Sequence, residues 1–568
     1  MNLSPPVIAR PSSTIVLLRA GEGEHAEVLV LQRADRGDQN SLRWVFPGGL
    51  VDATDDLLRV HFHDHDDAAA SSRLGLPEGG LDFWTAALRE TLEEAGLLLA
   101  LDERGEVVDA ARHADALDAW RQDVHGLARG QGGAAFAALL RTHGWRLPGR
   151  SVLPIAHWIT PHGMPKRFDT RFFVTAAPPR HEVRVDGVEI VDHRWVRVAD
   201  LAAQRSAVGV QGPTLAVAIE LARQSGVGEM LGWARGLGRL ETIQPRLALD
   251  ANGERHPVPP SHPAYAEIGR IDPLGRGLAH SRLRPGVAVA LVDDQLVRIT
   301  APNGSVMTWS GTNTYLLRAA GNDWVLIDPG PDDAAHVDAL LAALRERSAR
   351  LAAILVTHTH IDHSPATRAL VAATGAPRMG RLADHRAGQD PHFAPDVTLA
   401  DGERLDFGGG CVLRIIHTPG HASNHLCYLH EGQRLLFTGD HVMQGSTVII
   451  NPPDGDMAAY FASLQRVADE AGVAYDAIAP GHGFLIEQPA RALEALIAHR
   501  RKREAKVRSA LQASAALSID ELVVRVYDDV PADRHGIARR SLLAHLLHLR
   551  QQGHADESDG RWLLRFVP

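Results

Sequence analysis

Residues 355–363 read Leu-Val-Thr-His-Thr-His-Ile-Asp-His, and this stretch decides the fold of the second half of the chain. The apolar run at 351–356 predicts a buried strand. The turn after it holds four potential metal ligands, His358, His360, Asp362 and His363. Imidazole nitrogens and a carboxylate suit zinc, which takes His N and Asp O at roughly 2.0–2.2 Å. Because four such groups are costly to leave unpaired in a core, the cluster indicates a metal site rather than a chance loop in a chain with 31 His.

Three further residues of the ligand type follow, each at the end of a strand-like run. His421 ends the run Thr-Pro-Gly-His, Asp440 ends Leu-Leu-Phe-Thr-Gly-Asp, and His482 lies in Ala-Pro-Gly-His-Gly. A lone His beside a Gly is usually structural. The complete series, HxHxDH followed by a His, an Asp and a His, is much more specific.

On these motifs, the segment from Pro285 to His499 resembles a metallo-β-lactamase-fold hydrolase of the branch that includes glyoxalase II and the lactamase-beta-2-like endoribonucleases. The resemblance implies that one zinc is held by His358, His360 and His421. It implies that a second zinc is held by Asp362, His363 and His482, with Asp440 bridging the two.

Such paired metals, roughly 3.5–4 Å apart, share a hydroxide and stabilise attack on a carbonyl or a phosphate. Asp362 and Asp440 are the catalytic residues that this resemblance implies. Asp328 also matches the pattern of the fold and is expected to support the ligand loop, the alternative being a simple turn carboxylate. Asn313 and Tyr315 match its first strand and receive no chemical role.

The composition bounds the remaining possibilities. A chain of 568 residues with 45% hydrophobic and 23% charged residues predicts a soluble protein of three or four domains. The net charge of −10 argues against a global basic field for nucleic acid. Two cysteines give no disulfide framework, the first residues do not resemble a signal peptide, and no run approaches the ~18 apolar residues of a membrane span. We therefore expect a cytoplasmic location and no membrane contact.

The first half contains a helix-like run, 84–99, with the sequence Arg89-Glu-Thr-Leu-Glu-Glu-Ala-Gly-Leu at its centre. Glu90 lies three and four residues before Glu93 and Glu94, so the three carboxylates share a helix face and repel one another. A divalent cation such as Mg²⁺ offsets that repulsion, since it favours carboxylate oxygens. Gly96 is suited to end the helix.

With the preceding Phe-Pro-Gly-Gly, this run resembles the box of a Nudix hydrolase, and residues 10–225 are similar to coenzyme A diphosphatases. The resemblance implies that Glu93 and Glu94 bind Mg²⁺ or Mn²⁺, and that Glu90 is a ligand or the base that activates water. Glu182 or Glu189 is expected to add one more carboxylate, and the sequence does not choose between them.

The box departs from the family pattern in two ways. An insertion at 51–83 separates Gly49 from Arg89, and Leu81 stands where a Glu that pairs with the box Arg is expected. The insertion contains Asp52, Asp55, Asp56 and an alternating His/Asp run at 61–67. We expect this run to be a solvated, flexible loop, with metal binding as the alternative.

Residues 236–285 are rich in Pro and Arg and predict a surface linker. A capping box at Ser518–Glu521, a helix near 536–552 and a turn at Asp559-Gly560 indicate a small winged-helix-like domain. Its arginines, Arg539, Arg540 and Arg550, suggest nucleic-acid binding. The equally weighted alternative is that the third helix packs on the metal domain and helps to wall the active site.

The expected fold class is multidomain α/β and α+β. A Nudix α/β/α sandwich (1–235) and the linker (236–285) precede a metallo-β-lactamase αββα sandwich (286–500) and a winged-helix domain (501–568). We expect a fusion of two hydrolases, one acting through two zinc ions on a thioester or an RNA phosphodiester, the other a Mg²⁺-dependent diphosphatase. The expected partners are a coenzyme A derivative or single-stranded RNA. In the alternative hypothesis, the Nudix half is a non-catalytic nucleotide-binding module.

Overall fold

The computed structural model describes residues 7–37, 41–127, 130–179, 182–514 and 516–565. It divides into two compact units, Met1–Pro245 and Arg246–Pro568. Among the described residues, no helix combines the length and the apolar character that crossing a membrane requires.

The first unit is built on one mixed sheet with the strand order β3-β2-β1-β6-β5-β8, to which β4 and β7 add by pairing with β1 and β2. The strands are β1 (Arg10–Ala20), β2 (Ala26–Arg33), β3 (Trp44–Val45), β4 (Gly48–Leu50), β5 (Leu153–Ile159), β6 (Phe168–Ala176), β7 (Ile190–Arg197) and β8 (Thr242–Ile243). Because side chains alternate along a strand, Ile15 and Leu17 enter one core while Val16 and Leu18 enter the other.

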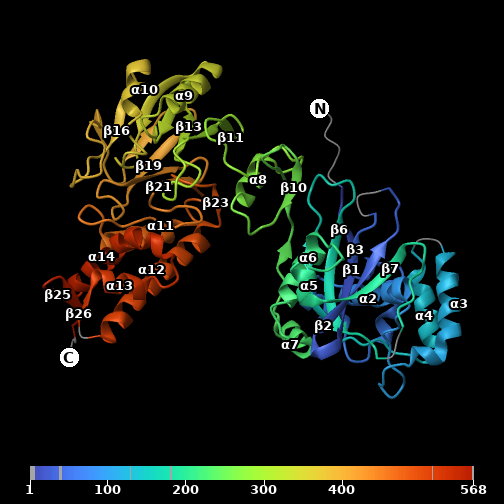
Figure 1. Ribbon diagram of the computed structural model, residues 1–568. Coiled ribbons are helices and arrows are strands. Elements are labelled where there is room, and N and C mark those ends of the chain that lie inside the picture. The colour runs from blue at the N-terminus through green and yellow to red at the C-terminus, as the bar shows by residue number, and fades with distance from the viewer. Residues whose placement is uncertain (1–6, 38–40, 128–129, 180–181, 515, 566–568) are drawn as a thin grey trace. The chain divides into compact units, whose positions relative to one another are not determined.

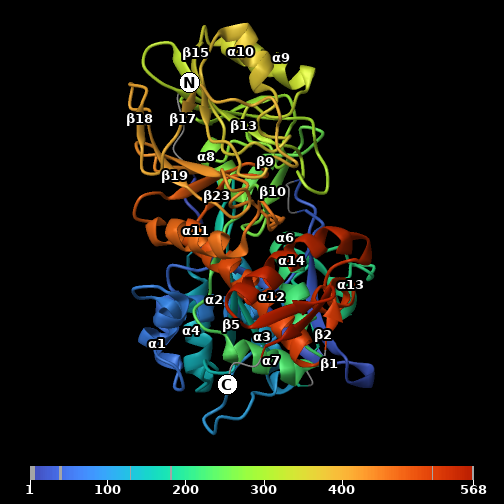
Figure 2. The ribbon, with the colours of Figure 1, turned by 90° about the vertical axis from the view of Figure 1, so that its left-hand side faces the viewer.

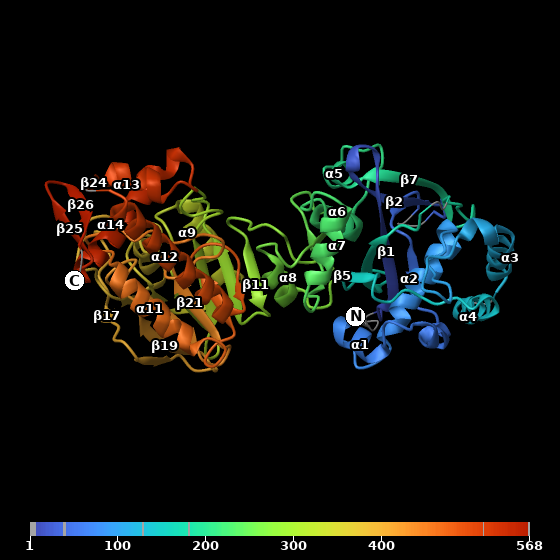
Figure 3. The same ribbon diagram turned by 90° about the horizontal axis from the view of Figure 1, so that it is seen from below.

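Helices cover both faces of this sheet, as Figures 1 and 3 show. One core contains side chains from α1 (Asp67–Leu74), α2 (Gly80–Ala95), α3 (Ala114–His125) and α4 (Gly132–His143). The other core contains side chains from α5 (Val198–Ala202), α6 (Gly212–Leu221) and α7 (Val227–Gly236). This arrangement is the predicted α/β/α sandwich.

The insertion at 51–83 is folded, and the run at 61–67 that was expected to be a solvated, flexible loop lies within it. It contains a 3₁₀ segment at Asp55–His61, helix α1, and the start of α2. Leu58 and Leu74 lie in the same core as Leu88, and Asp55 is fully buried. Within the run, His63 and Asp66 are exposed as expected, whereas Phe62 is buried and Asp64 accepts the backbone N–H of Gly149 at 2.9 Å, a contact distant in sequence.

The second unit contains two facing sheets, with the strand orders β11-β12-β13-β14-β15-β16-β17 and β18-β19-β20-β21-β22-β23. The strands of the first sheet are β11 (Ala288–Val292), β12 (Leu296–Thr300), β13 (Asn313–Arg318), β14 (Asp323–Ile327), β15 (Arg350–Leu355), β16 (Arg378–Gly380) and β17 (Val397–Thr398). Those of the second are β18 (Arg404–Asp406), β19 (Val412–His417), β20 (Leu426–His430), β21 (Leu435–Gly439), β22 (Ala477–Pro480) and β23 (Ile486–Glu487).

The core between the two sheets receives alternate residues of each strand, such as Leu317, Ile327, Ile415 and Phe437. The outer faces pack against helices α9 (Ala334–Glu346) and α10 (Thr367–Thr374) on one side. On the other side they pack against α11 (Met457–Glu470) and α12 (Pro489–Gln512). The layers form the predicted αββα sandwich. Cys411 and Cys427 are buried, free and in different cores.

The C-terminal residues form a winged helix, with α12 followed by α13 (Ile519–Val526) and α14 (His535–Gln551). A small sheet, β24 (Leu517–Ser518), β26 (Arg561–Leu564) and β25 (Ala555–Ser558), completes it. The predicted boundary at residue 500 falls inside α12, which is continuous. Figures 1 and 2 show α9 and α10 at the opposite end of the second unit from α12, α13 and α14.

Residues 246–285 belong to the second unit and are ordered. They form β9 (Arg246–Leu249), β10 (Arg255–Val258) and α8 (Tyr265–Ile271). Glu267 of α8 makes a buried ion pair with Arg298 of β12, and its Oε2 also accepts the backbone N–H of Leu485 at 3.3 Å. This segment therefore packs against the sandwich beside the loop that carries His482.

Candidate metal centres

The ligand-type residues of the second unit all follow the ends of strands. The loop with His358 and Asp362 follows β15, His421 follows β19, Asp440 follows β21, and His482 follows β22. Both sheets contribute, so the fold brings together side chains that are more than 120 positions apart.

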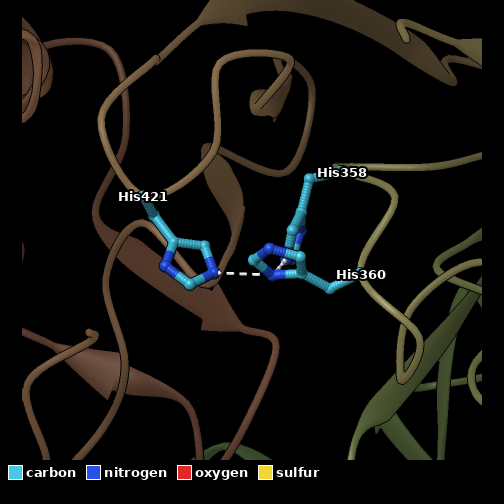
Figure 4. Close-up of side chains that lie close together, drawn as sticks. All are labelled: His358, His360 and His421. Atoms are coloured by element: carbon cyan, nitrogen blue, oxygen red, sulfur yellow. Dashed lines mark hydrogen bonds between the residues drawn. The ribbon is translucent and has the colours of Figure 1, made fainter. Parts of the chain in front are cut away.

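The imidazoles of His358, His360 and His421 converge on one point (Figure 4). Nδ1 of His360 lies 2.9 Å from Nε2 of His358 and 3.0 Å from Nε2 of His421. The rings pack at centroid separations of 4.5 and 4.6 Å. Three ring nitrogens thus meet within hydrogen-bond distance of one another.

The neighbours of these rings fix their protonation. Nδ1 of His421 lies 2.7 Å from the carbonyl oxygen of Ile449 and must donate to it. The Thr357 hydroxyl donates to Asp328 at 2.8 Å, so it accepts from Nδ1 of His358 at 3.0 Å. Nε2 of both neutral rings is therefore an unprotonated lone pair at the point of convergence, which is the state in which imidazole binds a metal.

In the second group, His363 and His482 also donate from Nδ1 to a protein oxygen. Nδ1 of His363 donates to Asp328 at 2.9 Å, and Nδ1 of His482 donates to the Gly311 carbonyl at 3.2 Å. The Nε2 atoms of both rings then face Asp362 Oδ2, at 3.6 and 3.4 Å. Nε2 of His363 is buried and has no hydrogen-bond partner.

Asp440 lies between the two groups. Its Oδ1 is 3.4 Å from His363 Nε2 and 3.1 Å from His482 Nε2, while its Oδ2 is 3.7 Å from His421 Nε2. Within the part of the chain that the structure describes, ligand atoms close enough to share an ion occur in three sets, His358/His360/His421, His358/His363/Asp440 and Asp362/His363/His482. The first and third sets match the two predicted groups, and Asp440 has an oxygen toward each.

Burial and neighbouring charges shift the histidine pKa values in opposite directions in the two groups. Burial, with His421 adding to its effect, lowers the pKa of His360 to about 3, and burial also holds the pKa of His358 well below its ordinary value. Burial also acts to lower the pKa of His482, but Asp440 and Asp362 outweigh it and raise that pKa to about 9. Without a cation, the carboxylates therefore attract protons onto His482. The donor set of imidazole and carboxylate fits a divalent ion of the zinc type.

Support residues surround these ligands. Asp328, which follows β14, accepts from the backbone N–H and hydroxyl of Thr357 and from His363, so it has the predicted supporting contacts. Asn313 and Tyr315, which had no expected role, donate to the carbonyl of Pro480 just before His482. In the sequence, only the position of these two residues in an expected strand could have indicated this role.

The winged helix also contacts the site. The backbone N–H of Ile450 donates to Ser541 Oγ of α14 at 3.3 Å, next to the Ile449 carbonyl that holds His421. Ala544 packs in the core of α11 and α12. Arg539 pairs with Asp520, and Arg550 pairs with Glu557, while Arg540 is exposed. One face of α14 is therefore buried against the αββα sandwich.

In the first unit, Glu90, Glu93 and Glu94 lie on α2, which ends at Gly96 in the left-handed conformation as predicted. The Phe-Pro-Gly-Gly segment closes over them. The Gly48 N–H donates to Glu94 Oε2 at 2.9 Å, and a Cβ at Gly49 would lie 2.3 Å from Glu90 Oε1. Only glycine permits this approach.

Burial and mutual repulsion disfavour the ionised form of these carboxylates. Burial raises the pKa of Glu90 to about 7, with Arg89 opposing and Glu93 adding to the rise. Burial and Glu90 raise the pKa of Glu94 well above its ordinary value, and Glu189 raises both. A hard divalent cation relieves this repulsion. Glu189, one of the two further carboxylates expected from sequence, adds to this rise, and its half-exposed side chain pairs with Arg36 at 3.0 Å.

Known proteins with similar sequences agree with this arrangement. Family models match residues 9–125 (NUDIX domain), 307–482 (metallo-beta-lactamase superfamily) and 518–562 (beta-lactamase associated winged helix domain). A beta-lactamase-like protein 2 homolog of Drosophila melanogaster is 30% identical over 277 residues, which are 47% of this chain and 91% of that protein.

An atrochrysone carboxyl ACP thioesterase of Aspergillus chevalieri is 31% identical over 266 residues, which are 44% of this chain and 80% of that protein. Among solved structures, a NUDIX hydrolase from Alicyclobacillus acidocaldarius aligns at 26% identity with a TM-score of 0.33, covering 40% of this chain and 96% of that one.

Both catalytic domain families are hydrolases, and this protein is a hydrolase. The chain belongs to the metallo-β-lactamase superfamily, and it carries a Nudix domain before the metallo-β-lactamase domain and a winged helix after it. The predicted order of the three domains is confirmed.

Proposed function

We propose that the second unit is a dinuclear zinc hydrolase that cleaves a thioester. His358, His360 and His421 would hold one ion, and Asp362, His363 and His482 the other, with Asp440 toward both. The observation that carries the proposal is the convergence of the Nε2 atoms of His363, His482 and His421 on the two oxygens of Asp440.

A bound pair of zinc ions supplies a reactive hydroxide at neutral pH and polarises the oxygen of the bond under attack. The chain supplies the geometry for this chemistry. Asp328, Ile449 and Gly311 hold the Nδ1 protons of His363, His421 and His482, which keeps each Nε2 free for the ion. The Asp362 side chain is 23% exposed, so solvent reaches the site on that side.

Two observations favour a thioester over an RNA phosphodiester. A relative at 31% identity is a thioesterase by name. The third helix of the winged helix also has one face buried on the sandwich, and two of its three noted arginines pair with carboxylates. The positive charge of the expected nucleic-acid surface is therefore partly neutralised.

The full chain can be assayed on acyl-coenzyme A and on single-stranded RNA, with bound zinc measured in the same preparation. We expect two zinc ions per chain, release of free thiol and intact RNA. Asp362→Ala should abolish thiol release, while Asp338→Ala, an exposed change on α9, should not. Cleaved RNA with no released thiol would contradict the thioester proposal and indicate a phosphodiester substrate instead.

For the first unit, we propose a Mg²⁺- or Mn²⁺-dependent diphosphatase that acts on a nucleoside diphosphate linkage such as that of coenzyme A. Glu93 and Glu94 would hold the ion, and Glu90 would be a further ligand or the base that takes a proton from water. The unrelieved charge of the buried carboxylates supports this assignment. When bound, the ion neutralises the phosphates and orients the attacked phosphorus.

The competing hypothesis is a non-catalytic nucleotide-binding module, motivated by Leu81 in place of the box carboxylate. Glu93→Gln separates the two. A catalytic site loses diphosphate turnover in this variant, whereas a binding module has no turnover in the unaltered protein. If both units act on acyl-coenzyme A, one reaction yields a free thiol and the other a phosphopantetheine product.

A further inference from the structure

Arg89 is at the centre of the carboxylate site of the first unit, and all of its N–H groups have acceptors. Nε donates to Asp55 Oδ1 at 3.0 Å, and Nη2 donates to Asp55 Oδ2 at 3.2 Å and to the Leu50 carbonyl at 2.9 Å. Nη1 donates to Glu90 Oε1 at 2.9 Å and to Glu93 Oε1 at 3.1 Å. Because a guanidinium carries five such donors, the set is complete.

Asp55 binds one edge of the guanidinium and thereby sets the direction of the other. Its two oxygens match the Nε and Nη2 donors in the planar arrangement that makes Arg–carboxylate pairs directional. The side chains of Arg89 and Asp55 are 4% and 0% exposed, so water does not compete for either. Nη1 is left facing Glu90 and Glu93.

Asp55 is itself held in place. Its Oδ2 accepts the backbone N–H of Asp52 at 2.7 Å. The carboxylate of Asp52 accepts from Thr54 at 2.7 Å and from the Gly132 N–H at the start of α4 at 3.3 Å. The first turn of the insertion is therefore tied to a helix of the core.

The residues at the usual place of the box carboxylate are occupied elsewhere. Leu81 is 1% exposed and lies in the core with Leu88. Its neighbour Asp82 accepts from Nε and Nη2 of Arg59, both at 2.7 Å. Neither residue is a partner of Arg89.

We propose that Asp55, supplied by the insertion, is the positioning residue that replaces the missing box carboxylate and keeps the Nudix site competent for metal binding and turnover. The inference rests on the proposed diphosphatase function of this unit. Without Asp55, the buried guanidinium loses its fixed edge and can turn, and Glu90 and Glu93 lose the donor that aligns them.

The test uses the full chain with Asp55→Asn, which keeps the shape and removes the charge. Asp56→Asn is the matched control, because Asp56 is the adjacent and exposed carboxylate. The readouts are kcat and KM on a nucleoside diphosphate at saturating Mg²⁺, and the Mn²⁺ binding that Glu93→Gln removes. We expect Asp55→Asn to lower kcat and this Mn²⁺ affinity by about 10–100-fold, the usual effect of losing a partner that orients a ligand, with KM nearly unchanged.

A double variant adds a sharper readout. In an Arg89→Gln background, Asp55→Asn should cause no further loss of kcat, since the residue that Asp55 orients is absent. If Asp55→Asn does not fold, Arg89→Lys takes its place, because it keeps the cation and removes the planar set of donors. Lysine should then lower kcat similarly while the folded state persists.

Wild-type kcat and Mn²⁺ affinity in Asp55→Asn, or wild-type turnover in Arg89→Lys, would overturn the inference. If the unaltered protein binds Mn²⁺ through Glu93 but cleaves no diphosphate, the proposed diphosphatase function fails and the affinity readout alone decides the role of Asp55. If Glu93→Gln removes no Mn²⁺ binding and no turnover, both proposals fail.

Discussion

The ligand-type side chains of the second unit come from four strand ends in two sheets, whereas those of the first unit come from one helix. The first arrangement gathers imidazoles whose backbone and side-chain neighbours each accept the Nδ1 proton. The second gathers like charges at helical spacing, which repel until a cation arrives. The comparison teaches that the imidazole site depends on tautomers and the glutamate site on charge balance.

The largest expected effect tests whether the two sites are independent. Asp440→Ala should reduce thioester hydrolysis on the order of 10³-fold or more, the scale of losing a directly participating group, and leave diphosphate cleavage intact. Glu93→Gln should reduce diphosphate cleavage and leave thioester hydrolysis intact. Both rates can be measured on the same preparation of each variant, and loss of both activities from one substitution would contradict independence.

Asp328→Asn should test the dependence on tautomers. Asparagine tolerates the left-handed backbone of this position, where φ is 52°. Asp328 accepts the Thr357 backbone N–H on one oxygen at 2.7 Å and Nδ1 of His363 on the other at 2.9 Å. An asparagine that keeps the first bond places its NH2 donor toward Nδ1 of His363, so the proton is driven toward Nε2. Zinc affinity and thiol release should both fall by about 10–100-fold. Chelator competition measures the affinity, and Asp338→Asn on α9 is the control.

The glutamate site should respond to pH in the opposite direction from an ordinary surface carboxylate. Glu90 has its pKa raised from 4.5 to about 7, so the folded state binds more protons than the unfolded chain between these values. The free energy of unfolding should therefore fall as pH rises from about 4.5 to 7, by about 1–3 kcal/mol without metal.

Saturating Mg²⁺ should flatten this slope, and so should Glu94→Gln, because each removes negative charge from the cluster. Calorimetric melting of the full chain over this pH range measures the effect. A first-unit transition whose stability rises with pH without metal would show that the carboxylates are not crowded.

The smallest expected effect concerns the contact between α14 and the imidazole site. Ser541→Ala leaves the buried N–H of Ile450 without an acceptor, which costs about 1–3 kcal/mol of stability, and loosens the chain segment that holds His421. Zinc affinity should fall only a few-fold on this scale. Ser509→Ala, an exposed change on α12, should alter neither quantity.

Local signals in the sequence predicted local structure well. The capping box of Ser518 and Glu521 opens α13, and Asp559-Gly560 forms the predicted turn with positive φ at both residues. The ligand motifs of the second unit were predictable because each follows an apolar run. In these cases the physical cause lies within a few residues.

Partners separated along the chain could not be predicted in the same way. Asp55 and Arg89 are 34 positions apart, and Glu267 and Arg298 are 31 apart. Each pair is recognisable only once the fold has excluded water from both side chains. The insertion and the Pro-rich segment therefore resembled loops in sequence, although each contributes a buried charge.

Helix α12 limits how the C-terminal module can change. Leu493 and Ile497 pack in the core of the sandwich, and Val507 and Leu511 pack in the core of the winged helix. Inserting one residue between the two pairs would rotate everything beyond it by about 100° around the helix axis. Ser541 would then no longer face Ile450. Substitutions in the winged helix are therefore tolerable, but insertions or deletions in α12 are not.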